Sequence, residues 1–322
     1  MRSRRVVSAV LCLCAGMTPS ARAQEFPNRA MRLLAPYGAG GSYDGMARII
    51  AGKLSEQLGQ QVVVENRAGA AGRIGMAAAI AMPPDGHNLM IIGNSQAVVP
   101  SIYLKVPYDL ARDIAPVAMI GVMTNVLVVH PSLPARSVKE LVTLSKAKSG
   151  AIRFGSGGTG GISHLSGELF KSMSGAIVEH VPYKSAAQAT IANVGGEIEM
   201  NVLNMSNAAP NIRANRLRGL AVSSFKRSQF LPDIPTLDGS GLKGYEIVEF
   251  YALALPAGTP VPLISRLHTE IAGAVNARDV RDRYANLSAE SALMNPEQTR
   301  TFILDEQRKY ARIVKEIGLK PE

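Results

Sequence analysis

Short apolar runs alternate with amphipathic segments along the first third of the chain. Apolar runs of strand length occupy residues 31–36, 61–65 and 88–92, whereas residues 43–58 and 74–81 carry apolar side chains at helical spacing. Strands that alternate with helices in this way are typical of βαβ units in a mostly parallel sheet. The pattern therefore predicts an α/β lobe in this part of the chain.

A second set of alternating elements follows the first. Strands are predicted at 117–121, 125–130, 152–154, 177–181, 198–202 and 217–222, and helices at 138–148, 163–173 and 186–194. A strand at 247–255 and helices at 263–275 and 296–317 complete the pattern. Because no long linker separates the two sets, we expect the chain to cross between two lobes twice, near 121–125 and near 247–251.

The predicted fold class is α/β, with two lobes that each contain a βαβ-based sheet flanked by helices. Two crossover strands would join the lobes. Residues 24–122 and 250–322 would form a discontinuous first domain, and residues 123–249 would form the second. This arrangement predicts a cleft between the lobes, which is a common position for a ligand site.

The first 23 residues have the pattern of a secretory signal peptide. A basic start with three arginines precedes an apolar run at 6–17, and Ala21-Arg22-Ala23 offers small residues at a cleavage site. The apolar run is too short to span a bilayer, and an uncleaved membrane anchor is the alternative. We therefore expect export to the periplasm, with cleavage after Ala23.

Composition narrows the possible functions further. Both cysteines, Cys12 and Cys14, fall in the predicted signal peptide, so the mature chain would contain no disulfide and no cysteine-ligated zinc. The formal net charge is +10, but the charges are dispersed and no basic–aromatic cluster occurs. Nucleic-acid binding is therefore not expected, and no sequence motif indicates a metal or a cofactor.

Each predicted lobe contains a glycine-rich loop between a strand and a helix, at 37–42 (YGAGGS) and at 155–161 (GSGGTGG). Glycine lets the backbone approach a ligand closely, and the free N–H groups and dipole at a helix start favour an anion. Nearby hydroxyl groups belong to Ser42, Ser156, Thr159 and Ser163. The two loops could hold a carboxylate across the cleft, and the alternative is that both are only tight turns.

Two enzyme classes are alternatives to a binding function. Residues 93–97 (GNSQA) approximate the nucleophile elbow of a secreted α/β hydrolase around Ser95, although Pro100 is expected to interrupt a helix directly after it. The spacing from Gly155 to Gly160 fits the fingerprint of a dinucleotide-binding oxidoreductase, with Glu179 near the expected place of a ribose-binding acid. Both alternatives stay open on the sequence alone.

A series of stretches resembles the substrate receptors of tripartite tricarboxylate transporters, also called Bug proteins. They are 36–44 (PYGAGGSYD), 65–75 (ENRAGAAGRIG), 84–89 (PDGHNL), 106–109 (VPYD), 155–160 (GSGGTG), 180–184 (HVPYK), 232–236 (PDIPT) and 256–260 (PAGTP). The resemblance extends from residue 26 almost to the C-terminus. It implies a Venus-flytrap periplasmic binding protein that is not an enzyme: a monomeric receptor that captures a small carboxylate and delivers it to membrane transporter subunits.

The resemblance also implies which residues bind the ligand. They are Gly40, Gly41 and Ser42 in the first lobe, and Ser156, Thr159, Ser163 and Tyr183 in the second. Five further candidates lie in or beside the same stretches, some of them where the chain departs from the family: Tyr37, Asp44, Ser95, Gln96 and Leu203. We interpret Asp44 mainly as an organiser of its own loop, through the loop N–H groups and the helix dipole. The chain departs from the family pattern at 94–97, at Ser185, at Phe250 and at Leu203, where relatives often carry aspartate.

These departures bear on the type of ligand, which we expect to be a carboxylate without an ammonium group. Burying an ammonium group without a partner is costly, and Leu203 is apolar at the position where an acid would pair with it. Hydroxy-, keto- and plain dicarboxylates or aromatic carboxylates should then bind better than aspartate or glutamate. Glu249 would reverse this expectation if its side chain faced the cleft, a question that the sequence leaves open.

Overall fold

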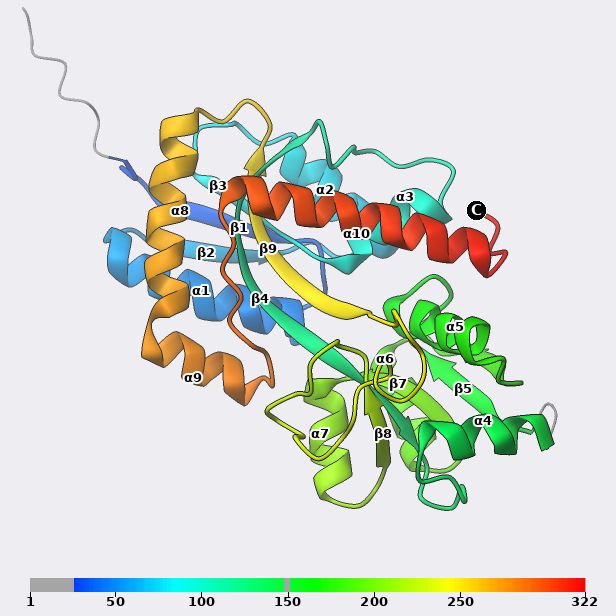
Figure 1. Ribbon diagram of the computed structural model, residues 1–322. Helices are drawn as coiled ribbons and strands as arrows, with labels where there is room; N and C mark the ends of the chain where they lie inside the picture. Colours follow the sequence, from blue (N-terminus) through cyan, green and yellow to red (C-terminus); the bar gives the residue numbers. More distant parts are fainter. Residues whose placement is uncertain (1–25, 148–150, 322) are drawn as a thin grey trace, which may run out of the picture.

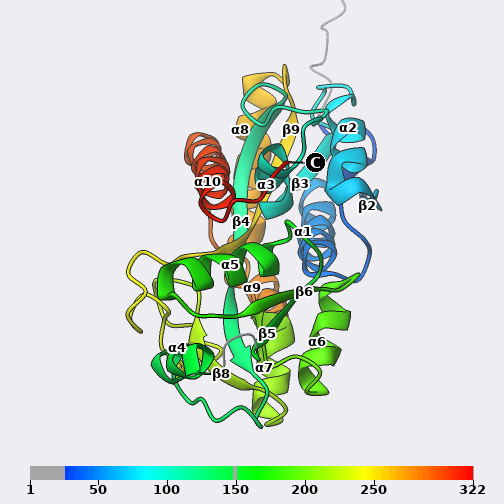
Figure 2. The ribbon, with the colours of Figure 1, turned by 90° about the vertical axis from the view of Figure 1, so that its right-hand side faces the viewer.

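The computed structural model describes residues 26–147 and 151–321, so the predicted signal peptide lies outside the described residues. Within these ranges, nine strands form a mixed sheet in the order β2-β1-β3-β9-β4-β7-β5-β6, and β8 also pairs with β4. Figure 1 shows one lobe above the other, and Figure 2, turned by 90°, shows the same division. The predicted two-lobed α/β fold is confirmed.

The first lobe, at the top of Figure 1, contains a parallel set of strands. Its strands are β1 (Met31–Ala35), β2 (Val62–Asn66) and β3 (Asn88–Ile92). Its helices are α1 (Ser42–Leu58), α2 (Arg73–Ile80), α3 (Asn94–Ile102), α8 (Val261–Asn276), α9 (Arg278–Asn286) and α10 (Pro296–Glu316), with a short 3₁₀ turn at Ala70–Gly72 before α2. The C-terminal helices thus return to the lobe in which the described chain begins.

The second lobe follows the same principle. Its strands are β5 (Arg153–Ser156), β6 (Glu179–Pro182), β7 (Met200–Asn204) and β8 (Arg218–Val222). Its helices are α4 (Val138–Ala147), α5 (Ile162–Ser174), α6 (Ala186–Val194) and α7 (Met205–Arg213). Strand β5 pairs in parallel with both β6 and β7, as expected for βαβ units.

Two long strands connect the lobes, β4 (Ile114–Val129) and β9 (Val248–Pro256). Strand β4 pairs antiparallel with β9 from Ile114 to Thr124, and it pairs with β7 and β8 from Asn125 onward. The change of partner therefore occurs within the region 121–125, where a crossing was predicted. The exact domain limits, at 122/123 and 249/250, stay a prediction.

Two sequence expectations about local structure were wrong. The apolar runs at 117–121 and 125–130 belong to one strand, β4. The backbone stays extended through Thr124 and Asn125 and enters the second lobe without a turn. Pro100 does not end the helix around Ser95, since α3 continues to Ile102 with the proline inside it. Proline has no backbone N–H, so Pro100 cannot donate to the Gln96 carbonyl one turn earlier. The hydroxyl of Tyr108 donates to this carbonyl instead, at 3.1 Å.

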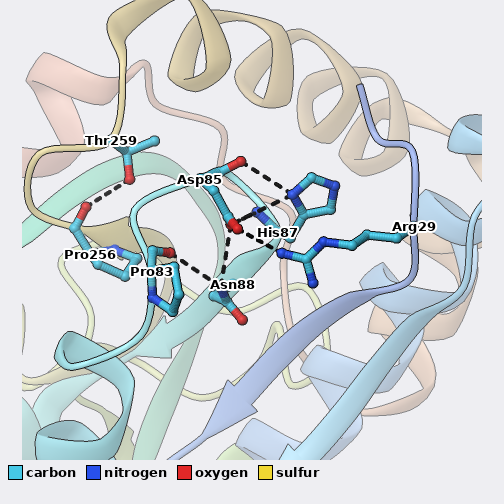
Figure 3. A network of polar contacts seen from close by, with 7 residues as sticks. All are labelled: Arg29, Pro83, Asp85, His87, Asn88, Pro256 and Thr259. Carbon is cyan, nitrogen blue, oxygen red and sulfur yellow. Dashed lines mark hydrogen bonds and ion pairs between the residues drawn. The ribbon is translucent and has the colours of Figure 1, made fainter. Parts of the chain in front are cut away.

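A polar network shown in Figure 3 stabilises the edge where β3 begins and β9 ends. The carboxylate of Asp85 accepts hydrogen bonds from Arg29 at 2.6 Å and from the backbone N–H of His87 at 3.0 Å. The hydroxyl of Thr259 donates to the carbonyl of Pro256 at 2.8 Å. The stretch 84–89 is thus held to Arg29 and closed on itself, and the stretch 256–260 closes its own turn. Both lie at the end of the sheet opposite the carboxyl ends of β1 and β3. None of the described helices is both long and apolar enough to cross a membrane.

Candidate functional site

A cavity of about 250 Å³ lies between the lobes, next to the crossover strands. The first lobe contributes Tyr37, Tyr43 and Ser95 to its walls, and the crossover strands contribute Asn125 and Glu249. The second lobe contributes Gly157, Gly161, Ile162, Ser163, Ala186, Ala189, Asn201, Val202, Leu203, Asn204 and Asn207. A smaller cavity of about 160 Å³ adjoins it and shares part of the wall around Ser95 and Gly157. A small molecule bound here would contact both lobes.

Five helices begin at the larger cavity. Wall residues at the N-cap or in the first turn of these helices include Tyr43 in α1, Ser95 in α3, Gly161, Ile162 and Ser163 in α5, Ala186 in α6, and Asn204 and Asn207 in α7. Free N–H groups and the helix dipoles make such ends electropositive. No lysine, arginine or histidine belongs to this wall in the described part of the chain, so the attraction for an anion comes from the backbone.

Asp44 shapes the glycine-rich loop of the first lobe. Its carboxylate accepts hydrogen bonds from the Gly40 N–H at 2.9 Å, from Arg48 Nε at 3.0 Å and from Asn66 Nδ2 at 2.9 Å. Burial alone would raise the pKa of Asp44, but the bonds from Arg48, Gly40 and Asn66 hold this pKa below its usual value. The side chain is buried and absent from the cavity wall, as expected of a loop organiser.

Stacked tyrosines form the first-lobe side of the cavity. The rings of Tyr37 and Tyr43 are nearly parallel, with centroids 3.9 Å apart, and Tyr43 also packs on Tyr251 at 4.6 Å. The Tyr43 hydroxyl donates to Asn94 Oδ1 at 2.9 Å, and the Tyr37 hydroxyl donates to Gln96 Oε1. Both rings are therefore fixed by the start of α3.

Glu249 faces this cavity from the crossover strand β9. Its Oε2 accepts hydrogen bonds from the hydroxyls of Tyr251 at 2.9 Å and Ser42 at 3.2 Å. Burial raises the pKa of Glu249, and the bonds from Tyr251, Asn204 and Ser42 partly oppose the shift. The condition that would reverse the expected ligand type is thus met, and the argument from Leu203 alone no longer holds.

A histidine pair supports the glycine-rich loop of the second lobe. The rings of His164 and His180 stack with centroids 4.0 Å apart. His180 Nε2 hydrogen-bonds the hydroxyl of Ser156 at 2.6 Å, and the N–H of Gly160 donates to His164 Nδ1 at 3.0 Å. Gly160 has a φ of +77°, which a residue with a side chain rarely adopts. The loop conformation therefore depends on both histidines and on glycine at this position.

Acidification should destabilise the protein through this histidine pair. Burial, reinforced by the charges of His164 and Lys171, lowers the pKa of His180 to about 4. In the unfolded chain the imidazole pKa is about 6.5, so between these pH values the unfolded chain binds more protons. The contribution of His180 to stability is thus complete above about pH 6.5 and is lost as the pH falls toward 4. Chemical unfolding across this range should show a shallower decline for His180→Gln, and an unchanged decline would contradict the assignment.

The predicted ligand-binding residues fall into three groups. Tyr37, Ser95, Ser163 and Leu203 line the larger cavity, and Thr159 lines the smaller one. Gly40, Gly41 and Ser42 lie at the start of α1 outside the wall, and Tyr183 lies beyond the end of β6, also outside it. Direct contact with a ligand stays a prediction both for the residues that line the cavities and for those outside the walls.

The third group is buried behind the walls. The hydroxyl of Ser156 hydrogen-bonds His180 and the Gly158 carbonyl, and Gln96 Oε1 accepts from Tyr37 and from the Gly93 N–H at 3.0 Å. Ser156 and Gln96 are both fully buried, and Asp44 is nearly so. This burial favours support of the loops for Ser156 and Gln96 and agrees with the interpretation of Asp44 as a loop organiser, and their direct contact with a ligand stays a prediction.

The geometry also weakens both enzyme alternatives. No histidine is found in the walls of the two cavities within the described ranges, so Ser95 has no histidine there to act as its base. Glu179 lies next to Arg153 in the strand register, where β6 and β5 begin. The glycine-rich loop follows the opposite ends of these parallel strands. Glu179 thus cannot reach a ribose bound at that loop. The described residues also contain no group of three or more potential metal ligands.

Several wall residues were missed on the sequence: Tyr43, Asn125, Asn201, Asn204, Asn207 and, as to its orientation, Glu249. Asn201 is fully buried, and neither its amide nitrogen nor its oxygen has a hydrogen-bond partner among the described residues. The available signal was the recurrence of asparagine in 201–207 (NVLNMSN), which runs from strand β7 into the first turn of α7. Polar residues at the carboxyl end of a strand commonly mark a site in α/β folds.

Comparisons with known proteins agree with this arrangement. The sequence profile described as "Tripartite tricarboxylate transporter family receptor" matches residues 46–319. Protein BugT of Bordetella pertussis is 34% identical over 316 residues, which cover 98% of this chain and 97% of that protein.

Solved structures show the same similarity. The R. palustris protein Rpa4515, solved with adipate, superposes with a TM-score of 0.83 at 30% identity, over 92% of this chain and 100% of its own. MatC from Rhodopseudomonas palustris, solved with bound malate, gives a TM-score of 0.77 at 25% identity, over 90% and 100% of the two chains. The extent of the profile match and the identity to BugT show that this chain belongs to the tripartite tricarboxylate transporter receptor family, a family of periplasmic solute-binding receptors.

Proposed function

We propose that this chain is a periplasmic receptor that holds a small organic carboxylate between its lobes and delivers it unchanged to membrane transporter subunits. The observation that carries the proposal is the convergence of five helix N-termini on one interlobe cavity without a basic side chain in its wall. Such a site suits a compact anion. The adipate and malate bound by the two solved relatives support a carboxylate.

The receptor acts as a monomer after export and cleavage following Ala23. Ligand binding draws the lobes together about β4 and β9, because a ligand that contacts both walls binds the closed form better. The receptor has no catalytic role, which is supported by the absence of histidine from the described walls around Ser95. A carboxylate incubated with the protein should be recovered unchanged, as mass spectrometry can verify.

Filling the cavity should abolish carboxylate binding. Ala186, the first residue of α6, lies in the cavity wall and is exposed, so the indole of Ala186→Trp would occupy ligand space without disturbing a core. Ala187→Trp is the matched control, because Ala187 is exposed but lies outside the wall. Both variants should unfold at the temperature of the unliganded wild type.

The measurement is a thermal-shift screen of the mature protein against mono-, di- and tricarboxylates, followed by calorimetry with the strongest binder. A carboxylate at about a hundred times its Kd should stabilise the wild type and Ala187→Trp by about 2.7 kcal/mol. Ala186→Trp should show no shift. If no carboxylate binds the wild type, or if both variants bind equally, the proposed function or the location of its site is wrong.

A further inference from the structure

Glu249 is the one charged side chain in the wall of the interlobe cavity within the described residues. It is held there by two hydroxyl groups, since Tyr251 and Ser42 both donate to Oε2. These hydrogen bonds favour the ionised form, but burial outweighs them and raises the pKa of Glu249, because no cation accompanies the carboxyl group. The cavity therefore combines electropositive helix ends with one buried carboxyl group that lacks a cationic partner in the described wall.

This charge distribution discriminates between ligands. A ligand that carries only carboxylates would place negative charge near Glu249, and the described wall supplies no lysine, arginine or histidine to offset it. A ligand ammonium group, by contrast, would neutralise Glu249 and give the enclosed carboxylate the partner that burial requires. The rings of Tyr37 and Tyr43 form the adjoining wall, and aromatic rings attract cations.

We propose that Glu249 is an ammonium-binding residue and that the ligand of this receptor is an amino carboxylate. The ligand carboxylate lies at the helix N-termini, and its ammonium group pairs with Glu249. Leu203, which is apolar where relatives often carry an acid, is then no obstacle, because Glu249 supplies the carboxylate from the crossover strand β9. This inference rests on the proposed receptor function and specifies the chemical class that the same cavity accepts.

The test compares amino carboxylates with analogues of the same carbon skeleton that lack the amino group. The probes are aspartate and malate, glutamate and 2-hydroxyglutarate, and 6-aminohexanoate and adipate, each measured by calorimetry. The wild type should bind the amino member of at least one pair more tightly, on the order of tenfold or more. The reason is that only the amino member can form the desolvated charge pair between its ammonium group and Glu249.

Glu249→Gln keeps the size of the side chain and removes its charge, so this variant should lose the preference within that pair. Glu246→Gln is the matched control, because Glu246 lies three residues earlier and lines a separate surface cavity. It should retain the wild-type preference.

The outcomes separate this inference from the proposed function. If malate, 2-hydroxyglutarate or adipate binds the wild type more tightly than its amino partner, the receptor function holds and the ammonium site is wrong. The same conclusion follows if Glu249→Gln, shown to be folded by its thermal unfolding, retains the amino preference. If neither class binds the wild type at millimolar concentration, the proposed function fails together with the inference.

Discussion

Replacing Asn94 with alanine should lower the free energy of unfolding by about 3 kcal/mol or more, because several buried groups lose their partner at once. Asn94 is fully buried at the start of α3. Its Nδ2 donates to the Val248 carbonyl at 2.8 Å and to the Tyr310 hydroxyl at 2.6 Å. Its Oδ1 accepts from the Tyr43 hydroxyl at 2.9 Å and from the Phe250 N–H at 3.0 Å.

The loss should also weaken ligand binding, because Asn94 connects α3 with β9 and with a tyrosine of the cavity wall. Chemical unfolding measures the change in stability, and calorimetry with the carboxylate found in the screen measures the affinity. Asn276→Ala is the control, since Asn276 is exposed at the end of α8. A variant Asn94→Ala with nearly wild-type stability would show that water or neighbouring groups replace these four hydrogen bonds.

The alternation of strands and helices could be predicted because apolar spacing changes between periods of about two and about 3.6 residues. The crossing in β4 was harder to interpret, since Thr124 and Asn125 interrupt an apolar run and look like a turn. In the fold these polar residues are buried and bonded to distant segments. The Asn125 side chain donates to the Ile247 carbonyl at 3.0 Å, and its N–H donates to Ser223 at 3.0 Å. Local pattern cannot reveal partners about a hundred residues away.

Proline in a helix poses the same difficulty. Pro100 predicts the end of a helix when only its neighbours are considered. The Tyr108 hydroxyl, which lies beyond the helix, satisfies the Gln96 carbonyl and makes the proline tolerable. The prediction was wrong because the compensating group comes from a later loop.

The candidate site was predictable in its backbone and less so in its side chains. The two glycine-rich loops were identified correctly as loops at helix starts, because glycine and strand–helix order are local features. The direction of a hydroxyl or a carboxylate depends on partners that only the fold brings near. Ser156 turns to His180, and Glu249 turns to Ser42 and Tyr251. The sequence therefore located the loops and left the polarity of the cavity undetermined.

Replacing Gly93 with alanine should displace a cavity wall and reduce carboxylate affinity on the order of tenfold or more. A Cβ on Gly93 would lie 2.1 Å from Cε1 and 2.3 Å from the hydroxyl oxygen of Tyr43. The Tyr43 ring cannot move freely, because it is stacked on Tyr37 and packed on Tyr251. Overpacking of this kind should also lower the free energy of unfolding by about 1–3 kcal/mol.

The matched control for this substitution is Gly38→Ala, in the adjacent first loop, where an added Cβ would meet no atom within 4 Å. Calorimetry should show nearly wild-type carboxylate affinity for Gly38→Ala and a marked loss for Gly93→Ala. Tyrosine fluorescence should change only in Gly93→Ala, because the stack of Tyr37 and Tyr43 must shift there. If Gly93→Ala binds like the wild type, the stacked tyrosines do not form part of the ligand site, and the ligand must lie closer to the second-lobe wall.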